Sequence, residues 1–394
     1  MEKRARWRIV ASTLLVGLVV RCPLVSLSPL LPNLERELRI GGLQVGILSA
    51  LPVLCMGIFA PIASRMWGVL GPRRMIAAAL GLEALGVGFR GMDASVPGLY
   101  VWTFVAGAGA GALNAALPAV VGKWGTARRE MSTGLYGASL NLGSAGISAT
   151  SVPLVVFLGS WSAGLDIWAV PVCATLIVWL RWSRSAFLPE SAIGARWRTT
   201  RPRGARVRLA ILFACLQAIV FYGAISWMAP YYESRGMHPT TAGNVLAVFS
   251  AVEIIAMAIP AIGRSHGWRW PPLGVAVGAC ATGLVGLVVM PVSLSWMVAI
   301  LLGLGVGAMF PLSLLLIADC SNSSRQTATL AGAAFFVAYV GAAGSPVVLG
   351  ALRDSSGNYE AGWLLLLACT AGMAAVTLLW RNGEVRTQCC MRHT

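Results

Sequence analysis

One arginine, Arg21, lies deep inside an apolar segment that runs from Ile9 to Leu31. It is about 12 residues into the segment, or about 18 Å at 1.5 Å per helical residue, which is near the centre of a bilayer. An arginine at that depth costs about 2.5–3.5 kcal/mol on insertion scales, so we expect it to face a partner or an aqueous cavity. Its planar guanidinium suits a small planar anion, because it can donate two parallel hydrogen bonds. A structural ion pair or a backbone contact is the alternative.

Two carboxylates also fall inside apolar segments. Glu83 lies in Met75–Gly91 and Glu253 lies in Ala242–Ile262. Burial favours the neutral form of a carboxyl group, so both are candidates for carrying a coupling proton. Glu83 is equally a candidate partner for a basic residue. Arg90 follows on the same helix face, about 10 Å away along the axis, and we expect its side chain to reach the nearby interface.

Other polar and aromatic side chains lie in the middle of apolar segments. They are Asn114, Asn141, Gln217, Tyr222, Trp227 and Tyr339. Each of them could simply form a hydrogen bond between helices. Together with Arg21 they could line one central substrate-binding cavity. Phe335 and Phe336 could form an aromatic wall of that cavity, or could equally face lipid.

The segments that carry these residues have the length of membrane spans. The chain has 394 residues, of which 57% are hydrophobic and 11% charged, whereas soluble proteins carry about 25% charged residues. The apolar runs do not alternate as the strands of a barrel do, so they must be helices. We predict an all-α membrane protein of about twelve spans. The other spans are Leu43–Ala63, Leu99–Val121, Gly134–Leu158, Ile167–Leu180, Leu209–Tyr231, Leu273–Val292, Trp296–Ala318, Thr329–Leu352 and Gly362–Trp380. Three prolines, Pro23, Pro29 and Pro32, predict a kinked or broken first span.

The basic residues indicate the orientation. The net charge of +16 fits the excess of Lys and Arg on the cytoplasmic side of membrane proteins, and no basic stretch has the signature of a nucleic-acid-binding fold. Basic residues gather at the N-terminus, at Arg65, Arg73 and Arg74, in the connection 181–208 and in the C-terminal tail. The opposite loops hold only Arg36, Arg39, Arg235 and Arg353. We expect a bacterial inner-membrane protein with both termini in the cytoplasm.

The chain divides into two similar halves. We predict a six-helix bundle over residues 1–180, a basic cytoplasmic linker over 181–208 and a second bundle with a short tail over 209–394. Glycine-rich stretches recur in the same order in both halves: Gly107–Gly111 with Gly303–Gly307, and Gly143–Gly146 with Gly341–Gly344. Such repeats are typical of transporters that bind substrate between two bundles near the midplane, although small residues also serve close helix packing.

Sequence motifs of common enzymes are absent. The chain has no GxxxxGK[ST], HExxH or GxSxG pattern. The three histidines lie outside the predicted spans. We therefore expect neither an enzyme nor a bound metal or cofactor.

The arrangement resembles the major facilitator superfamily, and within it the cyanate porter branch, which includes cyanate and nitroimidazole transporters. The resemblance covers nearly the whole chain. The stretches that carry it are Arg21–Ser26 with Pro29–Pro32, Leu51–Pro61, Asn114–Pro118, Thr133–Tyr136, Leu216–Gly223 with Trp227 and Pro230, and Phe310–Leu314.

Two positions differ from the family pattern. The loop between spans 2 and 3 usually has an Asp before its basic residues, and here Arg65, Arg73 and Arg74 are present without it. The branch tends to have a Gln where Phe335 stands. The first difference removes the acidic member of a gating ion pair. The second removes a polar contact in the site and makes cyanate itself less favoured as the substrate.

The resemblance implies a carrier of a small anionic or polar planar solute, coupled to protons or another gradient, that works by alternating access. We expect it to act as a monomer. The alternative is a proton-coupled efflux pump for drug-like or nitroaromatic compounds. Arg21 argues against the alternative, whereas Phe335 and Glu83 fit it.

Overall fold

The computed structural model describes residues 2–92, 95–121, 129–183, 204–259, 271–320 and 324–392. Over these residues the chain is helical and forms no β-strand. The helices are α1 (Glu2–Val19), α2 (Cys22–Val25), η1 (Ser28–Leu30), α3 (Leu31–Leu38), α4 (Gly42–Phe89), α5 (Val96–Val121), α6 (Arg129–Leu158), α7 (Trp161–Asp166), α8 (Ala169–Trp182), α9 (Ala205–Ser234), α10 (Pro239–Ala256), α12 (Pro271–Val289), η4 (Val292–Leu294), α13 (Ser295–Ala318), α14 (Ser324–Ser356) and α15 (Glu360–Arg392). Within these ranges, 11 helical segments are long and apolar enough to cross a membrane. The predicted helical membrane fold is confirmed.

The predicted third span is the second part of the long helix α4. This helix is interrupted at Gly71, where the backbone has φ 73° and ψ 162°. Glycine adopts a positive φ at no steric cost, and the proline that follows cannot continue the hydrogen-bond ladder. Residues 72–89 carry Arg73, Arg74 and Glu83, and these charges make the stretch less apolar than the 11 segments above.

The first span is broken, as its prolines predicted. α1 ends at Val19, and the chain continues through the short helices α2, η1 and α3. Proline has no N–H to donate and clashes with the preceding turn, so a continuous helix cannot form here. Arg21 lies at the break, between α1 and α2.

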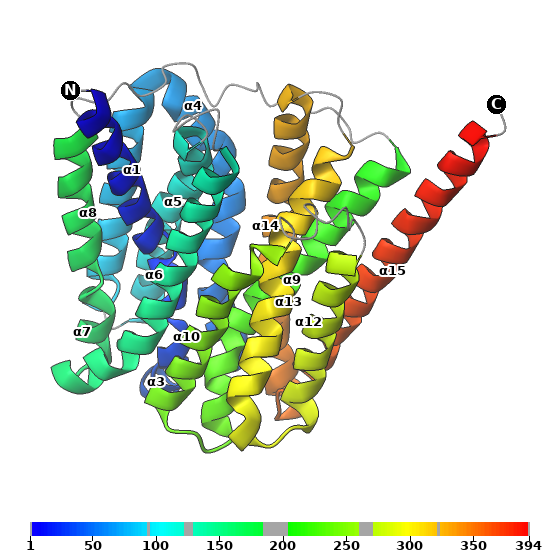
Figure 1. Cartoon of the computed structure of the whole chain (residues 1–394). Coiled ribbons are helices and arrows are strands. Elements are labelled where there is room, and N and C mark those ends of the chain that lie inside the picture. The colour runs from blue at the N-terminus through cyan, green and yellow to red at the C-terminus, as the bar shows by residue number, and fades with distance from the viewer. Residues whose placement is uncertain are drawn as a thin grey trace.

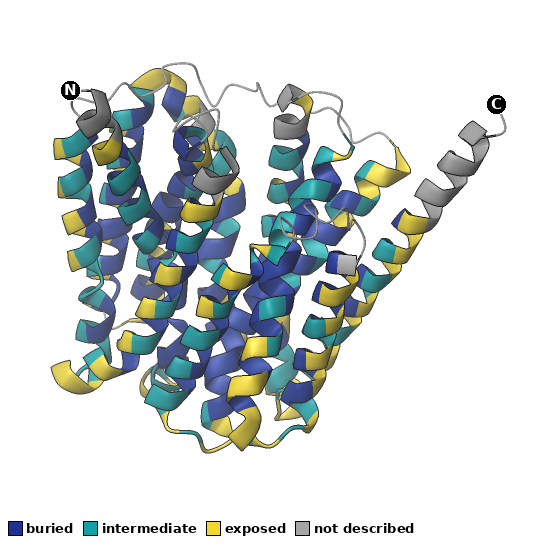
Figure 2. Cartoon of the chain, in the orientation of Figure 1, coloured by how far each residue is buried: buried dark blue, intermediate teal, exposed yellow. Residues whose placement is uncertain are grey.

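The helices before and after the linker form two groups that lie side by side (Figure 1). The start of α1 and the end of α15 lie at the same face of the molecule, which we call the terminal face, and α3 lies near the opposite face (Figure 1). Buried residues lie on the sides of the helices that face one another, and exposed residues follow the outer sides (Figure 2). Large apolar side chains such as Phe157 and Leu379 are exposed there, as expected of a surface that faces lipid.

The recurrent glycines pack in the same way in both halves. On α5, a Cβ at Gly109 would come within 2.5 Å of the carbonyl oxygen of Ala79 on α4. On α13, a Cβ at Gly305 would come within 2.5 Å of the backbone nitrogen of Cys280 on α12. The fourth span of each half therefore crosses its third span at backbone distance, which small residues permit.

Candidate functional site

A pocket lies where the broken first span meets the second half of the chain. Its walls come from α9, α10, α13 and α14, and Arg21 is the first half's contribution. The space that the centres of water-sized molecules can reach is about 40 Å³. Its polar and aromatic lining includes Arg21, Gln217, Tyr222, Glu253, Phe335 and Tyr339.

Arg21 is held in place from two sides. Its Nη1 donates a hydrogen bond of 2.6 Å to Oδ1 of Asn141, which is fully buried on α6. Its Cζ lies 5.1 Å from the ring centroid of Phe221 on α9, a cation–π distance. The guanidinium is thereby fixed at the pocket wall, and it has further N–H groups to donate.

Some of the other predicted polar residues line the pocket, and Asn114 contacts a residue that does. Gln217, Tyr222 and Tyr339 line the pocket. Asn114, on α5, donates from Nδ2 to the Tyr339 hydroxyl at 3.1 Å, so it links the two halves and positions the tyrosine. The Tyr222 hydroxyl donates to Sδ of Met56 at 3.4 Å.

The two candidate wall residues point in different directions. Phe335 lines the pocket, with its ring centroid 5.7 Å from Phe310 and 6.0 Å from Tyr339. Phe336 is 36% exposed and is not part of the pocket lining. The aromatic wall that we considered therefore includes Phe335 and leaves Phe336 at the outer surface.

The two buried carboxylates lie in different places. Glu253 lines the pocket, is 2% exposed, and its Oε1 has no hydrogen-bond partner among the described residues. Glu83 is fully buried within the first half and does not line the pocket. Neither of its oxygens has a hydrogen-bond partner in the described part of the chain.

The expectation that Arg90 reaches the membrane interface is wrong. Its side chain is fully buried. Nη1 donates to the carbonyl oxygen of Pro23 at 3.1 Å, and Nη2 donates to Oγ of Ser26 at 2.6 Å. Breaking a helix leaves carbonyl groups without their usual partners, and Arg90 satisfies one at the break in the first span. Arg90 therefore stabilises the segment that carries Arg21.

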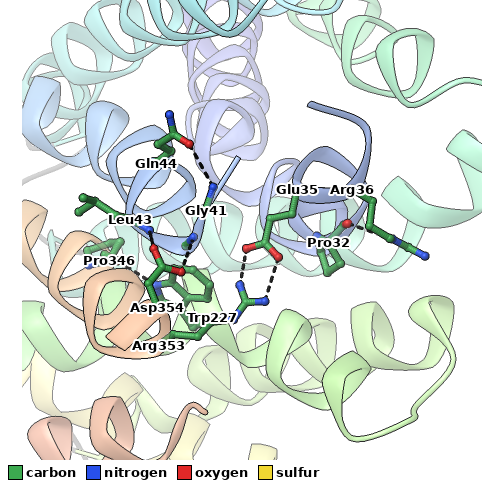
Figure 3. Close-up of polar contacts among 11 residues, drawn as sticks. Pro32, Glu35, Arg36, Gly41, Leu43, Gln44, Trp227, Pro346, Arg353 and Asp354 are labelled. Atoms are coloured by element: carbon green, nitrogen blue, oxygen red, sulfur yellow. Dashed lines mark hydrogen bonds and ion pairs between the residues drawn. The ribbon is translucent and has the colours of Figure 1, made fainter. Parts of the chain in front are cut away.

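Trp227 lies outside the pocket, in a cluster that joins the two halves near α3 (Figure 3). Its Nε1 donates to the carbonyl oxygen of Pro346 at 3.0 Å. Arg353 forms a bidentate ion pair with Glu35, in which Nη2 and Oε2 are 2.9 Å apart. The Arg353 guanidinium also lies 5.7 Å from the Trp227 ring and 4.9 Å from that of Tyr359.

Asp354 adds a second link at this face. Its Oδ1 accepts a hydrogen bond from Gly42 N and its Oδ2 accepts one from Leu43 N, both at 2.8 Å (Figure 3). We call Glu35, Gly42, Arg353 and Asp354 the closing cluster. Sequence analysis did not identify it. The signal was present, because Arg353 is one of the few basic residues predicted on the Arg-poor side of the membrane.

The predicted gating residues lie around the bend of α4 at Gly71. Arg65 and Arg74 are exposed. Arg73 donates from Nε to Oγ of Ser183 and from Nη2 to the carbonyl oxygen of Leu180, each at 3.1 Å. Arg73 thus binds the end of α8, within the first half. Most of the linker 181–208 lies outside the described residues.

Comparison with known proteins identifies the family. The model of the Major Facilitator Superfamily matches residues 11–346. The chain is 29% identical to the cyanate transport protein CynX of Escherichia coli (strain K12), over 92% of this chain and 94% of that protein. It is 28% identical to the 2-nitroimidazole transporter of the same strain, over 89% and 90%.

A solved structure shows the same fold. A bacterial homolog of the human lysosomal transporter Spinster, in an inward-facing and occupied conformation, superposes with a TM-score of 0.74 at 16% identity, over 95% of this chain and 96% of that one. Three observations lead to the same conclusion. They are the family match over most of the chain, the membrane-spanning helices and the pocket between the halves. The chain belongs to the Major Facilitator Superfamily and is a secondary transporter that works by alternating access.

Proposed function

We propose that this transporter carries a small anion, of about the size of cyanate, and binds it at Arg21. The observation that carries this proposal is the position of the guanidinium, at the wall of a pocket between the halves and fixed by Asn141. A buried fixed cation favours a solute of opposite charge, and its planar fork can bind two oxygens at once. Gln217, Tyr222 and Tyr339 add neutral donors and acceptors.

The size of the pocket supports a small solute. A single water needs about 10–15 Å³ of accessible space, so the pocket of about 40 Å³ has room for roughly three waters. That matches an anion of a few atoms. One relative is named a cyanate transport protein, which makes cyanate the first anion to test. One difference from the family pattern weakens the case for cyanate: this chain has Phe335 where the branch tends to have a Gln.

Aromatic side chains in the pocket support a second candidate. Phe335 and Phe310 present rings to the solute, and another relative is a 2-nitroimidazole transporter. Efflux of nitroaromatic or drug-like compounds is therefore the alternative. The volume of the pocket and the fixed charge of Arg21 favour the small anion.

We infer a monomer in a bacterial inner membrane, with the terminal face in the cytoplasm and residues 1–180 and 209–394 moving as two bundles. The Lys and Arg distribution supports this orientation. The closing cluster would then seal the outer side, and the coupling ion would be a proton carried by Glu83 or Glu253.

Solute counterflow in proteoliposomes tests the substrate class. The panel contains cyanate, nitrate, formate, benzoate, 2-nitroimidazole and a cationic dye. We expect counterflow of at least one small anion, and a loss of about 10- to 100-fold in its affinity in Arg21→Lys, because a hydrogen bond to a charged group contributes about 1.5–3 kcal/mol. The matched control is Arg39→Lys, an exposed arginine outside the pocket. Transport of the dye alone, or parental affinity in Arg21→Lys, would refute the proposal.

Cysteine labelling tests the orientation. Ser355→Cys and Ala205→Cys place exposed cysteines after the closing cluster and at the start of α9. In intact cells, in a background without the native cysteines, an impermeant maleimide should label the first and not the second. The reverse pattern would invert the topology.

A further inference from the structure

We infer that Glu253 couples a proton to the anion, because its carboxylate and the anion compete for one guanidinium, that of Arg21. The inference rests on the proposed anion transport and decides between the two buried carboxylates. Glu253, in the binding pocket, is then the proton carrier. Glu83, inside the first half, has a structural role as a counter-charge.

The geometry places one anion-binding group and one acid in the same small pocket. Arg21 and Glu253 both line it. They are not joined directly in the described structure, since Nη1 of Arg21 donates to Asn141 and Oε1 of Glu253 has no hydrogen-bond partner. A buried polar atom without a partner costs free energy. A solute or a water between the two side chains would remove that cost.

Among the described residues that line the pocket, Glu253 is the one carboxyl group, and the lining has no histidine or lysine. The charged side chains of the lining are Arg21 and Glu253, and its titratable neutral side chains are Tyr222 from α9 and Tyr339 from α14. From α13 the lining has only Val306, Gly307 and Phe310. α6, which packs against α10, contributes Tyr136, which interacts with Arg21 and Tyr339. We therefore assign the proton to Glu253, the one carboxyl group of the described lining.

The coupling step follows from charge balance. Across the empty pocket the Glu253 carboxylate balances the charge of Arg21, with which it interacts electrostatically. An anion that binds Arg21 takes over that role and repels the carboxylate, because like charges in a water-poor site disfavour each other. Glu253 then takes one proton from the water on the open side, and its new O–H can donate to the anion. The pocket has gained one negative and one positive charge, so the loaded carrier keeps the charge of the empty one.

Glu83 has different surroundings. It lies on α4 inside the first half, where Gly109 of α5 packs so closely that a Cβ there would come within 2.5 Å of the Glu83 nitrogen. Its charged neighbour is Arg90, which is fully buried and stabilises the break in the first span. A buried arginine needs a counter-charge, and Asp166 and Glu83 are the carboxyl groups that interact with Arg90.

Proton uptake on anion binding tests this assignment. Purified transporter in weakly buffered detergent solution is mixed with cyanate while a pH dye reports protons, and the Kd is measured from pH 6 to 8. We expect up to one proton taken up per cyanate bound, and a Kd that rises by up to about tenfold per pH unit once Glu253 is ionised. Glu253→Gln should lose both effects. Glu253→Asp, which keeps the carboxyl group, should retain them, and Glu83→Gln should show the parental uptake per bound cyanate.

The outcomes separate this inference from the proposed function. If Glu253→Gln still takes up a proton with cyanate, or if uptake disappears in Glu83→Gln alone, the assignment is wrong while anion binding at Arg21 stands. If Arg21→Gln binds cyanate as the parent does, the proposed function fails instead. If the parent binds cyanate without proton uptake between pH 6 and 8, Glu253 is not the coupling group.

Discussion

The carboxylate of Asp354, at the end of α14, caps the first turn of α4 by accepting a hydrogen bond of 2.8 Å from the backbone nitrogen of Gly42. A helix N-terminus has unpaired N–H groups and a partial positive charge, so a carboxylate there stabilises the helix. Here the cap comes from the other half of the chain. The same contact therefore serves the helix and holds the two halves together, and it must break whenever this face opens.

Removing the cap should favour opening at this face. Asp354→Ala leaves the first N–H groups of α4 without their acceptor, which costs about 1 kcal/mol, or roughly fivefold in the ratio of closed to open molecules. Spin labels at Phe157→Cys and Ser234→Cys, one in each half, report the separation. We expect a larger population at long distance. Ser355→Ala is the control, because Oγ of Ser355 bonds only within its own helix. An unchanged distance distribution in Asp354→Ala would show that the cap does not contribute to closure.

The ion pair between Glu35 and Arg353 should contribute to the same equilibrium. Both side chains are half-buried, and the guanidinium also lies over Trp227 and Tyr359. In a double-mutant cycle of Glu35→Gln and Arg353→Gln, followed with the same spin labels, we expect a coupling energy of about 1 kcal/mol. Arg353→Lys should open the face nearly as much as Arg353→Gln, because lysine loses the bidentate fork. Strictly additive effects would mean that the pair is not energetically coupled.

Arg90 and Glu83 should determine stability more than transport specificity. Arg90→Gln removes the donors to Pro23 and Ser26 and leaves Glu83 without its charged neighbour. Each of the two lost hydrogen bonds costs about 1.5–3 kcal/mol, because its donor is charged. We expect a lower unfolding temperature in detergent, and a smaller loss in the double variant Glu83→Gln, Arg90→Gln than the sum of the two single losses. Additive losses would argue that Glu83 does not balance Arg90.

Sequence reasoning predicted the helical membrane fold and the break in the first span, because hydrophobic length and proline position determine both. It was wrong about where Arg90 points. Proximity to the end of a span suggested the interface, whereas the broken first span offers Arg90 a free carbonyl inside the protein. That acceptor exists only once the first and third spans are packed together.

Sequence reasoning predicted the kind of site better than it predicted which residues form the site. Mid-span depth singled out Arg21 and Glu253, which the pocket brings together. The same criterion also selected Trp227 and Glu83, which lie elsewhere. Depth along a helix gives the level in the membrane, but the direction of a side chain around its helix depends on neighbours that a single sequence does not show. The closing cluster was missed for the same reason, since it joins residues more than 300 positions apart.

The glycines of α6 offer a matched test of close packing near Arg21. A Cβ at Gly143 would come within 2.0 Å of the carbonyl oxygen of Leu18, whereas a Cβ at Gly146 would meet nothing within 4 Å. Gly143→Ala should therefore cost about 1–3 kcal/mol by overpacking, and should impair transport because it displaces α1 just before Arg21. Gly146→Ala should be neutral or stabilising by up to about 1 kcal/mol, since alanine favours helix more than glycine does. Thermal unfolding in detergent and counterflow measure both effects. Equal behaviour of the two variants would mean that α1 and α6 do not approach at backbone distance.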